Sequence, residues 1–424
     1  MEHLLDSAPE EAEPPLEHVA VCVPSPVMRR HGRGMRGVFP FSANSREFRD
    51  VWYPNVTDAQ WNDWRWQLKS RLHSLQDFRR IFDLSQDEIV ALGGLGTALP
   101  AAVTPYYASL LSTTDSSDPL RRTMIPTPAE CHVMEYEAND PLHEDDDSPV
   151  PGLVHRYPDR VLFLATGMCA AYCRYCTRSR AVGGEKMSAR PRKRFDAALA
   201  YIERTPQIRD VVVSGGDPFT LSDAALEYVL SRLFAIPHVE MVRLGTKAPM
   251  VMPQRITMSL VRILKRFHPL FVSIHATHPR ELTPESSEAL SRLADAGVVM
   301  GSQTVLLSGV NDNTATATAL FRGLLRNRVR PYYLYQCDQV RGSSHFRTPL
   351  ETGLDIIRGV RGHTSGYAVP HYVVDLPGGG GKTAVCPDAV VRREGQVITF
   401  RNYEGREFDI VNPMIADTAS KDAS

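Results

Sequence analysis

Short apolar runs recur at regular intervals over the second half of the chain. They are Val161–Ala165, Val211–Val213, Met241–Leu244, Leu270–Ile274, Val298–Leu307, Pro331–Tyr335 and His371–Val374. Helix-compatible stretches separate them, near Phe195–Arg204, Ala224–Phe234, Gln254–Phe267, Pro284–Ala296, Thr314–Arg326 and Leu350–Val360. Strands that alternate with amphipathic helices are typical of βα units on a parallel sheet. The pattern therefore predicts an α/β fold, an incomplete (βα)6-type barrel.

The chain before these repeats has a helical pattern instead. Helices are predicted over Ala59–Leu75, after a Thr57-Asp58 cap, and near Phe78–Phe82 and Gln86–Leu92. In the first of them Trp61, Trp64 and Leu68 fall on one face. We interpret this aromatic stripe as part of a core and not as a cofactor site.

The same patterns divide the chain into four segments. Residues 1–35 form an acidic, Pro-rich arm that we expect to be disordered, and residues 36–152 form a helical N-terminal region. Residues 153–376 form the barrel, and residues 377–424 form a short C-terminal segment. Asn139–Gly152 combines an acidic run with Pro and Gly, which predicts an exposed hinge before the barrel.

Composition narrows the range of functions. Among 424 residues, 48 Lys and Arg balance 49 Asp and Glu, which argues against nucleic-acid or acidic-membrane partners. No apolar run approaches the ~20 residues that cross a bilayer. The acidic N-terminus does not resemble a secretory signal. We expect a cytoplasmic enzyme or binding protein.

Residues that could take part in catalysis or ligand binding follow the predicted strands. In strand order they are Cys169, Cys173 and Cys176; Ser214, Gly215, Gly216 and Asp217; Thr246 and Lys247; His275; Gln303; Gln336 to Asp338; and finally Asp375 with the Gly378–Lys382 run. The carboxyl ends of barrel strands form the active face in folds of this kind. We therefore expect these groups to converge on one mouth.

The cysteines have the spacing C-x3-C-x2-C. Seven cysteines is an odd number, so a disulfide framework is not indicated, and three of them lie within eight positions. Three thiolates can hold a four-iron cluster and leave one iron open, because such clusters otherwise take a cysteine at every iron. Buried structural thiols, or a zinc site with His155 as the nearest histidine, are the alternatives.

Two glycine-rich segments add to the picture. The glycines of Ser214–Asp217 let the backbone approach a ligand closely. The Gly378–Lys382 run is not a phosphate-binding P-loop, because Leu376 stands where that motif needs glycine. A lysine on a flexible glycine hinge suits a Schiff base, which must move between two amines.

Eight segments resemble the lysine 2,3-aminomutase family of radical S-adenosylmethionine (SAM) enzymes. They are VHRYPDRVLFLATGMCAAYCRYCTR, RDVVVSGGD, PQRIT, GVND, RPYYLYQCD, HFRTP, RGHTSGYAVP and VVDLPGGGGKT, and they extend from about Val154 to Thr383. The resemblance implies an incomplete radical SAM β/α barrel with a [4Fe-4S] cluster, SAM and pyridoxal 5′-phosphate.

The resemblance also implies residue roles. Cys169, Cys173 and Cys176 would hold the cluster, and Lys382 would bind pyridoxal phosphate. Arg156 and Arg160 would bind the phosphate group of that cofactor, and Tyr157 would lie near its ring. Ser214, Gly215, Gly216 and Asp217 would contact the SAM amino group, Gln303 its ribose, and His275 would be a cofactor neighbour. Arg178 would face the substrate carboxylate, and Asp338 and Asp375 its remote amino group. Tyr175 replaces a family histidine at the ribose, and Asn313 replaces a cysteine of the family's zinc site.

Asp338 and Asp375 bear on the substrate. Two buried carboxylates without a counter-charge are costly, so we expect a basic substrate to supply the cation. The predicted reaction is an isomerisation that moves the α-amino group of L-lysine to C3. Arginine is the second choice, because a guanidinium suits paired carboxylates, and action on a protein-bound lysine is a third. We also expect an electron donor such as flavodoxin or ferredoxin, and a homo-oligomer, a dimer or a tetramer.

Overall fold

The computed structural model describes residues 39–94, 99–183 and 191–412. The predicted N-terminal arm, residues 1–35, lies outside these ranges. The helices before the barrel are α1 (Ala43–Trp52), α2 (Asp58–Trp61), α3 (Trp64–Lys69), α4 (Leu75–Ile81), α5 (Gln86–Leu92), α6 (Pro105–Ala108) and α7 (Pro119–Arg122). None of the described helices combines the length and the apolar character that a bilayer crossing requires.

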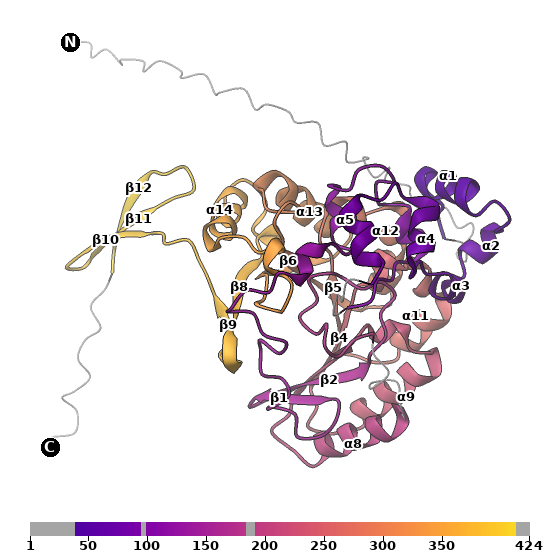
Figure 1. The fold of residues 1–424 in the computed structure, drawn as a ribbon. Coiled ribbons are helices and arrows are strands. Elements are labelled where there is room, and N and C mark those ends of the chain that lie inside the picture. Colours follow the sequence, from indigo (N-terminus) through magenta and orange to yellow (C-terminus); the bar gives the residue numbers. More distant parts are fainter. Residues whose placement is uncertain (1–38, 95–98, 184–190, 413–424) are drawn as a thin grey trace, which may run out of the picture. The chain divides into compact units, whose positions relative to one another are not determined.

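The barrel region alternates strands and helices (Figure 1). Its strands are β1 (Leu153–Tyr157), β2 (Arg160–Thr166), β3 (Asp210–Gly215), β4 (Met241–Thr246), β5 (Leu270–His275), β6 (Val299–Leu306), β7 (Arg330–Gln336), β8 (His371–Leu376) and β9 (Gly381–Ala384). Its helices are α8 (Pro191–Glu203), α9 (Asp223–Phe234), α10 (Ala248–Val251), α11 (Met258–Leu264), α12 (Pro284–Asp295), α13 (Thr314–Arg326) and α14 (Leu350–Val360). A three-stranded sheet of β10 (Val390–Glu394), β11 (Val397–Arg401) and β12 (Glu407–Val411) follows.

The nine strands β1 to β9 form one sheet in chain order. Strands β2 to β8 are parallel neighbours, whereas β1 and β9 pair antiparallel at the two edges. Within the described residues, no backbone ladder joins β9 back to β1. The predicted incomplete α/β barrel is therefore confirmed.

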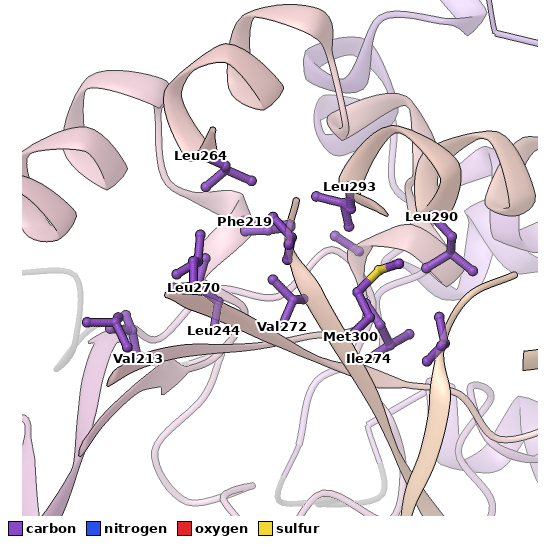
Figure 2. Packing of buried hydrophobic residues seen from close by; sticks show 14 of the residues in the cluster. Val213, Phe219, Leu244, Leu264, Leu270, Val272, Ile274, Leu290, Leu293 and Met300 are labelled. Atoms are coloured by element: carbon purple, nitrogen blue, oxygen red, sulfur yellow. The ribbon is translucent and has the colours of Figure 1, made fainter. Parts of the chain in front are cut away.

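Residue alternation gives this sheet two different faces. Figure 2 shows Val272 of β5 in an apolar cluster with Leu264 of α11 and Leu290 of α12. The alternate residues of β5, Ser273 and His275, line a cavity on the opposite face. The strands therefore separate a packed outer layer from a polar interior, as the period of two along a strand requires.

Two predicted helices have different bounds. The helix expected over Ala59–Leu75 is broken at Asn62–Asp63, where Asp63 accepts a hydrogen bond (2.9 Å) from the amide of Arg65 and caps α3. The helix expected near Gln254–Phe267 begins later, because the Thr257 side chain caps α11. In both cases a capping side chain inside the apolar pattern starts a new helix.

The remaining expectations for the N-terminal region divide. Trp61 and Trp64 are buried in one apolar cluster, which confirms the aromatic stripe as core. The prediction of an exposed hinge holds only in part: seven of the fourteen residues of Asn139–Gly152 are exposed, but Leu142 and Glu144 are buried. An acidic run favours a solvent-exposed segment, but Glu144 pairs with Arg178 and Asp147 pairs with Arg156.

The N-terminal region is fastened to the loop after β2. The amide of Tyr172 donates to the carbonyl of Ala102 (3.0 Å), and the amide of Arg174 donates to Thr123 (2.9 Å). The Arg174 guanidinium forms a buried ion pair with Glu130, at 2.5 Å. This loop contains the three clustered cysteines, so the helices support the part of the barrel that carries them.

Candidate active site

A cavity of about 390 Å³ lies on the inner face of the sheet. The predicted site residues among its lining residues are Arg156, Tyr157, Arg160, Arg178, Ser214, His275, Gln303, Asp338, Asp375 and Lys382. They come from eight of the nine strands of the sheet or from the loops that follow them. The volume falls in the range of small-molecule sites. The expected convergence on one mouth therefore holds for these residues.

The cysteine triad does not line the cavity itself. Tyr175 and Thr177, the two neighbours of Cys176, do line it. Among the described residues no three His, Cys, Asp or Glu side chains are placed around a single ion. A four-iron cluster binds each cysteine through a different iron, so it does not require such convergence. The chemistry of three neighbouring thiols therefore fits a cluster at the edge of the cavity.

Burial keeps the three cysteines protonated in the protein alone. It raises the pKa of Cys169, Cys173 and Cys176, and that of Cys176 reaches about 11. The neighbouring thiols add to the rise for Cys169 and Cys176. Lys247 acts in the opposite direction on Cys173, and Arg71 on Cys169. A metal centre binds the thiolate, so loading it must release these protons.

The glycines after β3 pack directly against the start of the cysteine loop. The amide of Gly216 donates to the carbonyl of Thr166 at 2.5 Å. A Cβ added at Gly215 would lie 2.3 Å from the Thr166 oxygen, and one at Gly216 would lie 2.3 Å from the Met168 oxygen. Only glycine fits so close to another backbone. The Gly215–Gly216 turn therefore packs against the start of the cysteine loop and fixes its position.

The Asp217 carboxylate is used inside the fold. It accepts hydrogen bonds from the Thr246 hydroxyl (2.7 Å) and from the amides of Lys247 and Phe219 (2.9 Å each). Asp217 is buried and is not among the residues that line the cavity. Its geometry suits a role in fixing the Gly215–Gly216 turn, with the backbone of that turn left to face a ligand.

Lys382 lies on strand β9, opposite Asp375 of β8. Its Nζ is 3.0 Å from Asp375 Oδ1 and 3.1 Å from Oδ2. The sequence predicts this lysine on a free glycine hinge, whereas the structure places it in a hairpin. Gly378 and Gly379 have φ values of 67° and 84°, which form the hairpin turn and which side-chain-bearing residues rarely adopt.

The two edges of the open sheet meet at this lysine. The backbone amide of Lys382 donates to the hydroxyl of Tyr157 on β1, at 3.1 Å. A Cβ added at Gly379 would lie 3.6 Å from the Arg156 guanidinium. We call this contact between β1 and β9 the seam. It brings together the predicted lysine, tyrosine and arginine although they are more than 220 positions apart in the chain.

Two arginines supply positive charge beside the seam. The Nε of Arg156 donates to Asp147 (2.7 Å), and a second nitrogen donates to the carbonyl of Leu142. The Arg160 guanidinium lies 4.3 Å from the centre of the Tyr157 ring. An amine, two guanidinium groups and a phenol form a donor set that fits an aldehyde with a phosphate group.

Asp338 and Asp375 face the cavity, but the premise that they lack a counter-charge is wrong. Lys382 forms an ion pair with Asp375. Burial, and to a smaller extent the nearby Asp375 charge, raise the pKa of Asp338 to about 6 against the effect of a 2.5 Å hydrogen bond from Thr177. At neutral pH the two acids outweigh the one ammonium, so the pair still attracts a cation.

Arg178 has an acidic partner that the sequence did not indicate. Its Nε and Nη2 donate to the Glu144 carboxylate, at 3.0 and 2.8 Å. Burial opposes ionisation of Glu144, yet the Arg178 charge holds the pKa of that carboxyl below its ordinary value. Glu144 lines the cavity as well. Nothing in the run Glu144–Asp147 distinguishes the acid that turns inward.

His275 and Gln303 lie side by side on neighbouring strands. They are register partners between β5 and β6. Burial, and then the positive charges of Lys247 and Arg178, lower the pKa of His275 to about 4. The imidazole is therefore neutral at physiological pH, able both to donate and to accept a hydrogen bond.

Comparisons with known proteins agree with this site. A family profile described as Lysine-2,3-aminomutase matches residues 357–418, and one described as Radical SAM superfamily matches residues 164–321. Proteins named L-lysine 2,3-aminomutase from Fusobacterium nucleatum subsp. nucleatum and Clostridium subterminale are 51% and 50% identical, over 85% and 83% of this chain and 85% of each relative. This chain belongs to the lysine 2,3-aminomutase family.

Further matches show the breadth of that family. A protein named glutamate 2,3-aminomutase from Clostridioides difficile is 40% identical over 86% of both chains. Among solved structures, Streptococcus suis SuiB bound to S-adenosylmethionine matches 52% of this chain and 51% of that chain, with a TM-score of 0.41 and 12% identity. The last likeness is too weak to support an argument.

Family membership confirms the predicted class of reaction. The protein is a radical SAM aminomutase, an isomerase whose substrate is an amino acid, and its cofactors are a [4Fe-4S] cluster, SAM and pyridoxal phosphate. The thiols of the cysteine triad, and the amine and guanidinium groups at the seam, fit these groups chemically.

Sequence reasoning missed a wall of tyrosines. Tyr333 and Tyr335 of β7 line the cavity, and the Tyr335 ring centre is 5.5 Å from Lys382 Nζ. Burial and the charge of Asp375 raise the pKa of Tyr335 well above its ordinary value. Tyr332 lines the cavity as well, where the register between β6 and β7 shifts, so the alternation in Tyr333-Leu334-Tyr335 is a signal for two of the three tyrosines.

Proposed function

We propose that this aminomutase converts L-lysine to β-lysine. The observation that carries the proposal is the pair Asp338 and Asp375, which lie in the same cavity as Lys382. A substrate with a second amino group brings the cation that these acids attract. The relatives named L-lysine 2,3-aminomutase, at 51% and 50% identity, support the same substrate.

The charge balance also depends on Lys382. Its ammonium offsets Asp375 in the protein alone. When its amine is bonded to pyridoxal phosphate, Lys382 would no longer hold a free ammonium against Asp375. Asp375 is then available to the remote ammonium of the substrate, and Asp338 provides the second acceptor.

The cofactor roles are assigned to the predicted residues. Cys169, Cys173 and Cys176 hold the cluster; Arg156 and Arg160 hold the phosphate, with Tyr157 at the ring; Ser214, His275, Gln303 and the Gly215–Gly216 backbone, which Asp217 fixes, contact SAM. When bound, the cluster and SAM supply radical chemistry at C3, and pyridoxal phosphate supplies an aldehyde that carries the migrating nitrogen.

The protein side chains then have positioning tasks. Arg178 faces the substrate carboxylate, and Glu144 keeps its guanidinium in one orientation through two hydrogen bonds. Tyr175 takes the place of the family histidine; its hydroxyl lies 2.9 Å from the Thr277 hydroxyl. The Tyr333 and Tyr335 rings contribute aromatic surface to the cavity.

The test is product identification with matched amino acids. The anaerobically reconstituted enzyme is incubated separately with lysine, arginine and glutamate at equal concentration. We expect β-lysine to form fastest. Faster turnover of arginine would favour the second candidate, which paired carboxylates accommodate bidentately. Faster turnover of glutamate would overturn a basic substrate altogether.

Variants of the acid pair make the test specific. Asp338→Asn and Asp375→Asn each remove one acceptor of the cation, and we expect kcat/KM for lysine to fall roughly ten- to hundredfold. Asp295→Asn changes an exposed acid that pairs with Arg328 and does not line the cavity, and serves as the control.

The remaining predictions concern the cellular setting. We infer that a flavodoxin or ferredoxin donates the electron, and that the protein works as a homo-oligomer in the cytoplasm. The four-segment division at residues 35, 152 and 376 also stays a prediction. These inferences rest on the sequence and on the family resemblance alone.

A further inference from the structure

Arg71, in the N-terminal region, touches the cysteine loop. Its Nη1 donates to the backbone carbonyl of Cys169 at 2.7 Å, and its Nε donates to the carbonyl of Leu68 at 3.1 Å. The guanidinium lies 6.0 Å from the centre of the Tyr172 ring. Its positive charge is therefore fixed beside the first cysteine of the triad.

Other cations near the triad already have acidic partners. Lys247 pairs with Glu281 at 2.5 Å. Arg174 pairs with Glu130, and Arg178 pairs with Glu144. Each of these pairs presents a dipole to the thiols and little net charge.

Arg71 differs from them. Over the residues that the structure describes, it makes no ion pair with a carboxylate within 4.0 Å, and its hydrogen bonds go to neutral carbonyl groups. Arg71 is thus the cation at the triad whose charge is not offset within the described residues.

The backbone holds Arg71 in this place. Leu72 exchanges two hydrogen bonds with Val103, at 2.8 and 3.0 Å. The neighbouring Ala102 accepts the amide of Tyr172 at 3.0 Å. These bonds connect the segment that carries Arg71 to the cysteine loop, so the distance between charge and thiol cannot drift freely.

We propose that Arg71 raises the reduction potential of the iron–sulfur cluster by placing an uncompensated positive charge beside Cys169. Reduction adds one negative charge to the cluster, and a fixed cation nearby stabilises the reduced form more than the oxidised form. Arg71 would act on the cluster through its charge, because it contacts the backbone of Cys169, a cluster-binding residue, and not the substrate. The proposal rests on the assignment of the cluster to the cysteine triad.

The experiment measures the cluster potential in the full-length enzyme. Wild type, Arg71→Gln and Arg71→Lys are reconstituted anaerobically, and iron content is determined first. Wild type without a cluster would overturn the assignment of the triad, which is a separate failure. The cluster is then titrated potentiometrically and followed by electron paramagnetic resonance, with no substrate turnover involved.

We expect the ratio of reduced to oxidised cluster, at a fixed solution potential, to fall about tenfold in Arg71→Gln. For one electron this corresponds to a midpoint about 59 mV lower. Arg71→Lys keeps the charge and should stay close to wild type. Arg80→Gln is the matched control, because Arg80 also donates to a carbonyl, that of Trp52, and lies 4.7 Å from the centre of a tyrosine ring.

Three results would overturn the proposal. The first is an unchanged midpoint in Arg71→Gln. The second is an equal fall in Arg71→Lys, which would mean that guanidinium geometry and not charge matters. If Arg71→Gln contains no iron, it is replaced by Arg71→Met, which keeps an apolar stem. The third result is loss of iron in both neutral variants but not in Arg71→Lys, which would show that Arg71 is needed to retain the cluster and does not set its potential.

Discussion

The amine of Lys382 lies 3.0 Å from a carboxylate oxygen of Asp375, so the cavity contains its own cation before any ligand binds. The same amine is the group that we assign to pyridoxal phosphate. One side chain therefore has two alternative partners, a carboxylate and an aldehyde. When Lys382 binds the aldehyde, its ion pair with Asp375 is broken. Binding of the cofactor is therefore linked to Asp375, the acid that we assign to the substrate.

Replacement of Lys382 tests the assignment directly. We expect Lys382→Ala to abolish covalent retention of pyridoxal phosphate after borohydride reduction, because the only assigned attachment point is removed. Mass spectrometry of the intact chain measures the bound mass. Lys247→Ala would be a poor control, since Lys247 is buried in an ion pair, and exposed Lys69 is the better one. Retention in Lys382→Ala would contradict the assignment.

The ionisation of Asp338 predicts a pH dependence. Burial raises the pKa of this carboxyl to about 6, so it becomes an acceptor for a cation only as the pH rises through that value. The lysine ammonium stays protonated throughout this range. We expect kcat/KM for lysine to rise about tenfold per pH unit below 6 and then to level off. A profile of kcat/KM against pH measures it, since this ratio reports the free enzyme.

Asp338→Asn is the control for that profile. The variant should have a lower kcat/KM without the limb near pH 6. If the limb persists unchanged in the variant, another group is responsible for it.

Single site residues could be predicted from the motifs in which they lie, but their charged partners could not. Asp338 was predicted because it follows a strand of the barrel, and Arg178 because it matches a family arginine. The sequence did not indicate Glu144, which neutralises Arg178, or Lys382 as the counter-charge of Asp375. Such pairs join segments that are remote in the chain, and no local pattern records which acid meets which base.

At the scale of elements, three strand ends are fastened to one another. The turn after β3 donates to the carbonyls of Thr166 and Met168 after β2. Asp217 in the same turn accepts hydrogen bonds from the residues that end β4. The cysteine loop thus begins from a rigid platform, which fixes where its first thiol lies.

Gly216→Ala should damage this platform. The added Cβ would lie 2.3 Å from the Met168 oxygen, and a backbone atom cannot move aside cheaply. We expect a loss of about 2 kcal/mol in the free energy of unfolding and a lower iron content. Gly366→Ala is the control, because no atom lies within 4 Å of its added Cβ. Chemical denaturation and iron analysis measure the two effects, and equal behaviour of both variants would contradict the argument.

The order of the elements could be predicted, and their ends were less certain. Alternation of apolar strands with amphipathic helices located β2 to β8 because each buries one face on the helices. The helix breaks at Asp63 and Thr257 were missed, since a capping side chain within an apolar pattern does not disturb its period. The hairpin at Lys382 was predicted as a hinge, because a glycine run does not specify whether its neighbours pair.

At the scale of the whole described chain, the N-terminal helices support the barrel loop through Arg174. Its guanidinium donates to the carbonyls of Leu99 and Pro100 and pairs with Glu130, and the two charged side chains are 0% and 8% exposed. A buried pair is costly to break from one side, since the remaining charge has no water.

Arg174→Met should therefore cost about 3–5 kcal/mol in the free energy of unfolding and loosen the cysteine loop. Denaturant midpoints and iron content are the measurements. Arg209→Met is the control: Arg209 and Glu240 are each 61% exposed, and pairs of this kind contribute little. An Arg174 variant as stable as the control would show that the N-terminal region does not depend on this contact.

The seam between β1 and β9 has a mechanical consequence. Neighbouring strands elsewhere in the sheet are joined by ladders of backbone bonds, whereas within the described residues these two edges share one hydrogen bond, between the Tyr157 hydroxyl and the Lys382 amide. Separation of the edges there costs far less than separation of any other pair. We therefore expect the sheet to open first between β1 and β9. A large ligand would then enter the cavity next to Lys382, the residue assigned to bind it.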